Sequence, residues 1–302
     1  MGSLTIAGDG VFELSTDPET LTITNEIAYW PIDNLGGTFT HNDGTVEITT
    51  NTNTIIKGMD GTDATNTLYN LVCNLGSDGY RLQLRPSGST NTIAGDLTIV
   101  QGMFQPETNT QSLTVSGNVI VSGGHLNGYS AARTGADNYK TLTIDAGASG
   151  TATQGVMTLS GTRDNISFDN QGTFIHNDGT VKIDFETPSY NSNSKIRCGG
   201  DDGNLYNLEV EMNRASDATN MQPSEGTEMT IENDLTVTKG EFYKYHNSHA
   251  LIVSGTVSVE AVGIFGNNNA TGADTLGSVD AKSSSEYRAT QGNTKIIVGP
   301  WR

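Results

Sequence analysis

The sequence is poor in positive charge: 16 Lys and Arg residues stand against 34 Asp and Glu residues, for a formal charge of −18. Nucleic acids and anionic membrane surfaces attract proteins through clustered cations, so this composition argues against both as partners. No apolar run approaches the roughly 18 residues of a membrane span, and the first residues lack the basic and apolar segments of a signal peptide. We expect a soluble protein, made in a cytosol, that does not insert into membranes.

Cysteine and aromatic residues are scarce as well. Cys73 and Cys198 are too few and too isolated for a disulfide framework, and Cys73 alternates in phase with Leu71 and Leu75, which predicts a buried thiol. Hydrophobic residues make up 34% and aromatic residues 7% of the chain. These values disfavour a pair of globular sandwich domains and favour a fold with a narrow apolar interior.

A long internal duplication dominates what is present. GTFTHNDGTVEI at 37–48 recurs as GTFIHNDGTVKI at 172–183, LYNL recurs from Leu68 at Leu205, and DLT recurs from Asp96 at Asp234. The order of the blocks is the same in both copies. We predict one domain over 1–302, with internal repeats at approximately 4–141 and 142–278 and a partial third repeat at 279–302.

Inside each repeat the hydrophobic period is two. Apolar residues from Tyr206 to Met212 alternate with Asn207, Glu209 and Glu211, the pattern of a half-buried strand. Turn residues separate such segments, and no stretch has helical periodicity. Propellers and tandem sandwiches fit the long repeat less well. The predicted fold is all-β, a parallel right-handed β-helix (β-solenoid), in which each repeat holds about six coils of roughly 20–25 residues.

The succession GTFxHNDGTV, LYNL, DLTVxxGxF and LTVSGxVxV resembles Gly/Thr/Asn-rich β-solenoid repeats of bacteriophage virion proteins, especially those of marine phages. It is related in pattern to repeats of bacterial surface adhesins. The resemblance spans nearly the whole chain. It implies a capsid-decoration, fibre or spike role in phages, or surface attachment in bacteria, and it brings no catalytic residues with it.

The HNDG segments are the most conspicuous polar motifs. We interpret them as structural turns, because Asn and Asp bond locally to the backbone and Gly44 and Gly179 are suited to positive φ. An active site is normally built once, whereas a turn that the coil requires recurs in each copy. The turn residues are His41, Asn42, Asp43, Gly44, His176, Asn177, Asp178 and Gly179.

Other polar groups are candidates for catalytic or metal-binding sites. Paired carboxylates serve glycan hydrolysis and oxygen clusters bind calcium, but each candidate reads more simply as a solvated turn or strand face. The threonine residues are spaced too irregularly from coil to coil to form an ice-binding surface. His246 and His249 lack a third zinc ligand. The acidic candidates are Asp60, Asp63, Asp201, Asp202, Glu209 and Glu211. We predict no enzymatic activity, no cofactor and no metal site.

A candidate contact surface is the aromatic segment 242–246 of the second repeat, because the first repeat has a different sequence at the same place. Tyr is favoured at interfaces, and the apolar C-terminal residues would cover the last coil or dock into a partner. The candidate contact residues are Phe242, Tyr243, Lys244, Tyr245, His246 and Trp301. Because solenoid ends need covering, we expect partners among other virion proteins or copies of the chain, with a homotrimer as the first expectation. A host-surface glycan is a further candidate partner.

Together these features predict a non-enzymatic structural component of a bacteriophage virion, either capsid decoration or a tail or head fibre. The expected location is the virion, after synthesis in the host cytoplasm. Two alternatives stay open. One is a tailspike-type protein that binds or depolymerises polysaccharide, and the other is a bacterial adhesin at the extracellular surface.

Overall fold

The structure is a computed structural model that describes residues 2–15, 19–24, 29–59, 66–86, 90–127, 133–161, 166–185, 193–198, 203–212, 217–221, 228–244, 250–266, 274–282 and 286–288. It divides into two compact units, Met1–Ala152 (unit 1) and Thr153–Arg302 (unit 2). The described part consists of strands, turns and loops, without helix. The all-β prediction is therefore confirmed.

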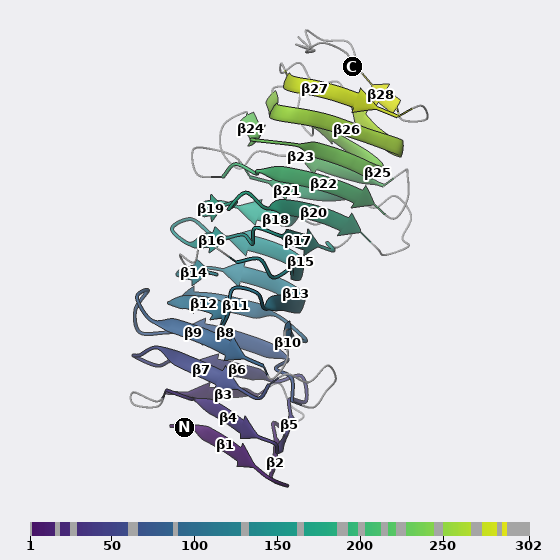
Figure 1. Ribbon diagram of the computed structural model, residues 1–302. Coiled ribbons are helices and arrows are strands. Elements are labelled where there is room, and N and C mark those ends of the chain that lie inside the picture. Colours follow the sequence, from purple (N-terminus) through teal and green to yellow (C-terminus); the bar gives the residue numbers. More distant parts are fainter. Residues whose placement is uncertain are drawn as a thin grey trace. The chain divides into compact units, whose positions relative to one another are not determined.

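Unit 1 contains sixteen strands among its described residues, stacked as successive layers (Figure 1). They are β1 (Leu4–Ala7), β2 (Val11–Glu13), β3 (Thr20–Ile23), β4 (Ile32–Leu35), β5 (Thr38–Thr40), β6 (Thr45–Ile48), β7 (Thr54–Lys57), β8 (Asn70–Asn74), β9 (Arg81–Arg85), β10 (Thr90–Ile93), β11 (Leu97–Gln101), β12 (Met103–Pro106), β13 (Ser112–Val121), β14 (His125–Leu126), β15 (Asp137–Ile144) and β16 (Ser149–Thr151).

Two long sheets run through unit 1, and their neighbouring strands are parallel. One has the order β1-β4-β7-β9-β12-β14-β16, and the other runs β3-β6-β8-β11-β13-β15, with β10 also paired to β13. In the second sheet Val46 pairs with Leu71, Leu71 with Leu97 and Leu97 with Val119. Each partner lies about one coil further along the chain, which defines a parallel β-solenoid.

Unit 2 follows the same rule with twelve strands in its described part. They are β17 (Val156–Leu159), β18 (Ile166–Asn170), β19 (Thr173–Ile175), β20 (Thr180–Phe185), β21 (Asn193–Arg197), β22 (Asn207–Met212), β23 (Ala218–Met221), β24 (Glu228–Ile231), β25 (Leu235–Lys244), β26 (Ala250–Gly266), β27 (Thr275–Ala281) and β28 (Glu286–Arg288). Strand β25 pairs in parallel with β22 through its first half and with β23 through its second half.

The core of each unit is a stack of aliphatic side chains from equivalent strand positions. Strands β20 and β22 alternate half-buried and buried residues, as the period of two predicted. The stacked and buried residues are Val46, Leu71, Leu97, Val119 and Leu142 in unit 1, and Met157, Val181, Leu208, Leu235 and Val257 in unit 2. Burial of each such side chain contributes about 1.5–3 kcal/mol, so a thin apolar interior is sufficient for this fold.

Candidate functional site

The two HNDG segments form the same tight turn. Asn42 and Asp43 have φ values of 43° and 58°, and the Gly44 amide donates to the His41 carbonyl at 2.8 Å. The second copy repeats this, with φ values of 51° and 56° and a Gly179 to His176 bond of 3.0 Å. Two consecutive positive φ angles closed by such a bond are the signature of a type I′ turn.

The expectation that the glycines take the positive φ was wrong, since Asn and Asp do so in both turns. The glycines serve close approach instead. A Cβ on Gly179 would lie 1.9 Å from the Thr153 carbonyl oxygen, and one on Gly44 would lie 2.8 Å from Leu14 Cδ1. Neighbouring coils therefore leave room for hydrogen alone at this position.

The turn histidines bond within the turn and stack on the next coil. Nδ1 of His41 accepts the Asp43 amide at 2.9 Å, and the His41 ring stacks on Tyr69 with 5.2 Å between centroids. His176 repeats both contacts with Asp178 and Tyr206, at 3.0 Å and 5.4 Å. An Nδ1 that accepts a hydrogen bond leaves the ring proton on Nε2. In both copies the histidine therefore stabilises the turn to which it belongs and its packing on the next coil.

One contact distinguishes the second histidine from the first. Nε2 of His176 lies 3.2 Å from Oε2 of Glu232, and the other carboxylate oxygen, Oε1, accepts a hydrogen bond from Asn204 at 3.2 Å. The aligned position in the first repeat is Ala94. This His–Glu pair is therefore a property of unit 2 and not of the repeated motif.

A polar ladder along one corner of each unit escaped the sequence analysis. In unit 1 the Asn70 Oδ1 accepts the Asp96 amide at 2.9 Å, and Asp96 Oδ1 accepts the Asn118 amide at 2.7 Å. Thr141 then donates to the Asn118 Oδ1 at 2.9 Å. The signal was available, because Asn70 and Asp96 belong to the duplicated LYNL and DLT motifs.

Unit 2 builds the corresponding ladder from its own copy. Asn207 Oδ1 accepts the Asp234 amide at 3.2 Å, Asp234 Oδ1 accepts the Thr256 amide at 2.7 Å, and Ser278 donates to the Thr256 hydroxyl at 2.9 Å. Each step joins one coil to the next. The recurring polar residues of the repeat therefore connect coils within each unit.

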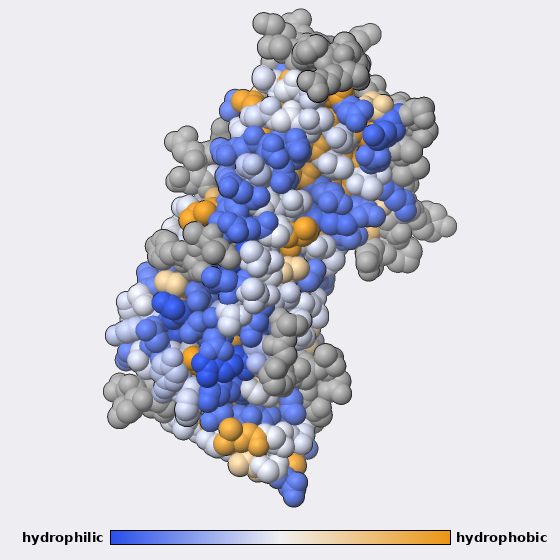
Figure 2. Space-filling view, in the orientation of Figure 1, coloured by the Kyte–Doolittle hydropathy of each residue, from blue (hydrophilic) through white to orange (hydrophobic). Residues whose placement is uncertain are grey.

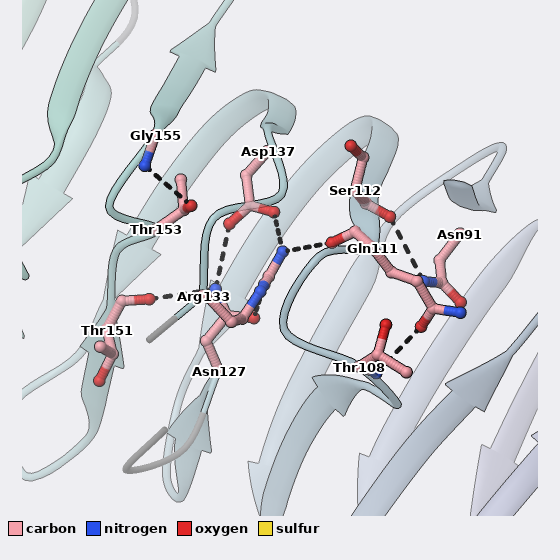
Figure 3. A network of polar contacts seen from close by, with 10 residues as sticks. All are labelled: Asn91, Thr108, Gln111, Ser112, Asn127, Arg133, Asp137, Thr151, Thr153 and Gly155. Carbon is pink, nitrogen blue, oxygen red and sulfur yellow. Dashed lines mark hydrogen bonds and ion pairs between the residues drawn. The ribbon is translucent and has the colours of Figure 1, made fainter. Parts of the chain in front are cut away.

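Unit 1 also contains a buried charged cluster that has no counterpart in the repeated motifs (Figure 3). The Arg133 guanidinium donates to Asp137 Oδ1 at 2.6 Å, to the Gln111 carbonyl at 3.1 Å, and to Asn127 Oδ1. Asn127 in turn donates to Asp137 Oδ2 at 3.1 Å and to the Thr151 carbonyl at 3.0 Å. The side chains of Arg133 and Asp137 are only 2% and 0% exposed.

The burial of this cluster is reflected in its ionisation. Desolvation raises the pKa of Asp137, although Arg133 and hydrogen bonds oppose that change. Burial likewise raises the pKa of Tyr139, and the neighbouring Asp137 adds to this effect. At the position aligned with Arg133 the second repeat has Ala270, while Asp137 is retained as Asp274. The cluster is thus a device of unit 1 for fixing the start of β15.

The acidic pair on β22 forms ion pairs with a lysine on the neighbouring strand of the sheet, β20. Lys182 Nζ lies 2.5 Å from Glu211, 3.4 Å from Glu209 and 3.5 Å from Asp184. Partial burial disfavours the charged amine, but the hydrogen bond to Glu211 and the nearby carboxylates outweigh it and raise the pKa of Lys182. Glu209 and Glu211 therefore belong to an ion-pair cluster.

The predicted contact surface is only partly visible. Phe242 is 1% exposed and stacks on Phe265 at 6.2 Å, so its side chain belongs to the core of unit 2 and not to a surface. Tyr243 is half-buried, and Lys244 ends β25. Tyr245, His246 and Trp301 lie outside the described residues, as do Asp60, Asp63, Asp201 and Asp202.

The cysteines, metal ligands and membrane-spanning segments considered from the sequence can be compared with the described residues. Cys73 and Cys198 are free thiols with 0% exposure, as the alternating pattern predicted for Cys73. Within the ranges given above, no group of three or more His, Cys, Asp and Glu side chains is arranged to hold a metal ion. The same residues include no helix able to span a membrane.

Neither the family models nor the curated proteins match this sequence, and no solved structure matches its fold.

Proposed function

We propose that the chain is a non-enzymatic structural component of a bacteriophage virion, either a capsid decoration or part of a tail or head fibre. The observation that carries the proposal is the set of hydrogen bonds that the duplicated polar residues form. His41, Asn70 and Asp96 bond to their own or adjacent coils, as do their counterparts in unit 2. The duplication preserves these bonds within and between coils, which is what a scaffold requires.

The repeat pattern supports the assignment to a virion. The succession of HNDG, LYNL and DLT motifs resembles β-solenoid repeats of phage particles, and the parallel solenoid supplies the stiffness that such components need. The described residues on the face shown in Figure 2 are largely hydrophilic, with small separate hydrophobic patches. In this proposal the partners are other virion proteins or copies of the chain, as a homotrimer, and an outer face contacts the host surface.

A depolymerase of the tailspike type would place a carboxylate pair beside a bound sugar. Lys182 lies between Glu209 and Glu211 on the outer face of unit 2 and forms ion pairs with both. Both carboxylates are thus engaged by a lysine inside an ion-pair cluster, which supports a non-enzymatic role for that face.

The test is quantitative mass spectrometry on particles purified by density gradient and on washed cells from the same culture. The proposal expects the chain to co-sediment with particles: hundreds of copies per particle would indicate capsid decoration, and a few to tens would indicate a fibre. Recovery of the chain with the cells alone would overturn the proposal and would favour the adhesin.

A further inference from the structure

The first repeat carries an exposed aromatic pair at the outer surface of unit 1. Tyr29 is 53% exposed and Trp30 is 42% exposed, with their rings edge to face at 6.0 Å. The Tyr29 carbonyl accepts hydrogen bonds from the Ile55 amide at 2.9 Å and the Thr54 hydroxyl at 3.2 Å. Strand β7 thus fixes the backbone of the pair while much of both rings faces solvent.

A lysine and a buried carboxylate accompany the aromatic pair. Lys57 Nζ lies 3.2 Å from the centre of the Trp30 ring, a cation–π contact. Asp33 on β4 is in register with Lys57 on β7, so both side chains project from the same face. Asp33 is only 8% exposed, and among the described residues its Oδ1 has no hydrogen-bond partner.

Unit 2 shows what this location is like without the aromatic pair. There Asp169 is in register with Arg197, and the two form an ion pair at 3.2 Å. When Asp169 is matched with Asp33, Ile166 stands three residues before it, where the first repeat has Trp30. In unit 1 the equivalent cation, Lys57, lies on the indole instead. Where unit 2 has an ion pair, the first repeat therefore has a cation–π contact at an exposed ring and no ion pair between Lys57 and Asp33 among the described residues.

A second ion pair borders the aromatic surface. Arg85 on β9 is in register with Lys57 and donates to Glu107. The hydrogen bond to Glu107 raises the pKa of Arg85, and Tyr29 lies close enough to add to this effect. Lys57 and Arg85 balance the charges of Asp33 and Glu107 on these neighbouring strands, so this part of a strongly acidic chain is locally neutral.

We propose that Tyr29, Trp30, Lys57, Asp33, Arg85 and Glu107 form a binding site for neutral hexose units of a polysaccharide. A pyranose presents an apolar C–H face, which packs against an exposed indole or phenol ring. Its hydroxyl groups both donate and accept, so they match carboxylates that lie next to cations. A polyanionic glycan would face the repulsion of the acidic chain.

In this site Lys57 leaves the Trp30 face when a sugar ring stacks there and turns to Asp33, its register partner. The unsatisfied oxygen of Asp33 then gains the charge-assisted bond that Asp169 has in unit 2. This inference rests on the host-contact part of the proposed function and names the chemical class of that contact.

The experiment uses tryptophan fluorescence of the full chain. The sequence contains two tryptophans, so Trp301→Phe leaves Trp30 as the single reporter. This variant is titrated with maltohexaose, cellohexaose and mannohexaose, and with hexagalacturonate as the acidic comparison. We expect a saturable change in emission with at least one neutral hexasaccharide and none with hexagalacturonate.

Variants then locate the binding with the same sugar, measured by calorimetry in the chain with native Trp301. Trp30→Ala should weaken binding by about tenfold or more and Trp30→Phe by less, because a phenyl ring retains part of the stacking surface. Ile166→Ala, at the matched position of unit 2, should leave the affinity unchanged. Circular dichroism verifies that each variant keeps its strand content.

The proposal is overturned if none of the three neutral sugars binds, if hexagalacturonate alone binds, or if Trp30→Ala binds as well as the unmodified chain. These results are independent of particle composition. Sugar binding by a chain that is absent from virions would refute the proposed function alone, whereas virion incorporation without sugar binding would refute this inference alone.

Discussion

Replacing Arg133 with methionine removes the cation from the buried cluster of unit 1. The Asp137 carboxylate, 0% exposed, then keeps its desolvation cost without its partner. Loss of one member of a buried ion pair costs about 3–5 kcal/mol of unfolding free energy. We expect a loss of about that size for Arg133→Met, and a similar one for Asp137→Leu, which leaves the guanidinium buried.

The loss in Arg133→Met should depend on pH in a defined direction. Burial raises the pKa of Asp137 even with Arg133 present, and removal of Arg133 takes away a charge that opposes this shift. A carboxyl group whose pKa is raised in the folded state stabilises the fold at pH values below its unfolded pKa of about 3.9. This contribution to the free energy of unfolding is lost as the pH rises toward the pKa of the folded state. The variant should therefore be destabilised less at pH 5 than at pH 8.

Two further variants separate the orphaned charge from simple loss of contacts. The double variant Arg133→Met/Asp137→Leu leaves no unpaired ion of this pair, but Asn127 loses hydrogen bonds, so we expect a cost of about 1–3 kcal/mol. Arg85→Met is the matched control, because its pair with Glu107 is 38% and 22% exposed. An ion pair of that kind contributes about 0–1 kcal/mol.

The assay is guanidinium unfolding followed by Trp30 emission in the Trp301→Phe background, since Trp30 belongs to unit 1. The reasoning fails if Arg133→Met costs no more than Arg85→Met. It also fails if the double variant loses the full sum of the two single losses, because the coupling that defines the pair would then be missing.

Three other predictions follow from the contacts described above. Gly179→Ala should cost more than Gly44→Ala in thermal unfolding, because the new Cβ meets a backbone carbonyl at 1.9 Å in the first case and the end of a leucine side chain in the second; equal costs would contradict this. Asp96→Ala should cost about 1–3 kcal/mol, because the Asn118 amide loses its acceptor, and Asp96→Asn should recover part of that loss in the same denaturant assay. Burial raises the pKa of the Cys73 and Cys198 thiols, so they stay protonated when folded while unfolded thiols ionise near pH 8.5. Stability should therefore fall above that pH by up to about 1.4 kcal/mol per pH unit for each thiol, and native protein should resist iodoacetamide at pH 8; rapid alkylation before unfolding would refute the burial.

Much of the fold was predictable because its determinants are periodic. Alternation from Tyr206 to Met212 indicated strands, and a long duplication without helical periodicity indicated a solenoid whose strands pair in parallel. The buried positions Leu208, Val210 and Met212 of β22 followed from the same alternation. Such local signals do not depend on how distant segments meet.

The remaining features depend on contacts between coils, which spacing alone does not reveal. In HNDG, the choice between Asn, Asp and Gly for positive φ was decided by the approach of Thr153 and Leu14 to the glycines. Phe242 lies in a sequence that reads as exposed, yet it packs on Phe265 in the core. Arg133 occurs once, so no repeated pattern marked it, and the fold brings it to the Gln111 carbonyl of the neighbouring coil.

The aromatic surface was also outside the reach of the repeat argument. Trp30 is one of two tryptophans in the sequence, but its relation to Lys57 and Asp33 arises from the register of β4 and β7. The proposed sugar site lies where the repeats differ, whereas the duplicated His41, Asn70 and Asp96 bond within the fold.

The most direct test of the central claim is immunogold electron microscopy of gradient-purified particles with an antibody against the chain. The structural account predicts gold at a regular place on intact particles, over the capsid or along a fibre. Unlabelled particles beside labelled cell surfaces would contradict it.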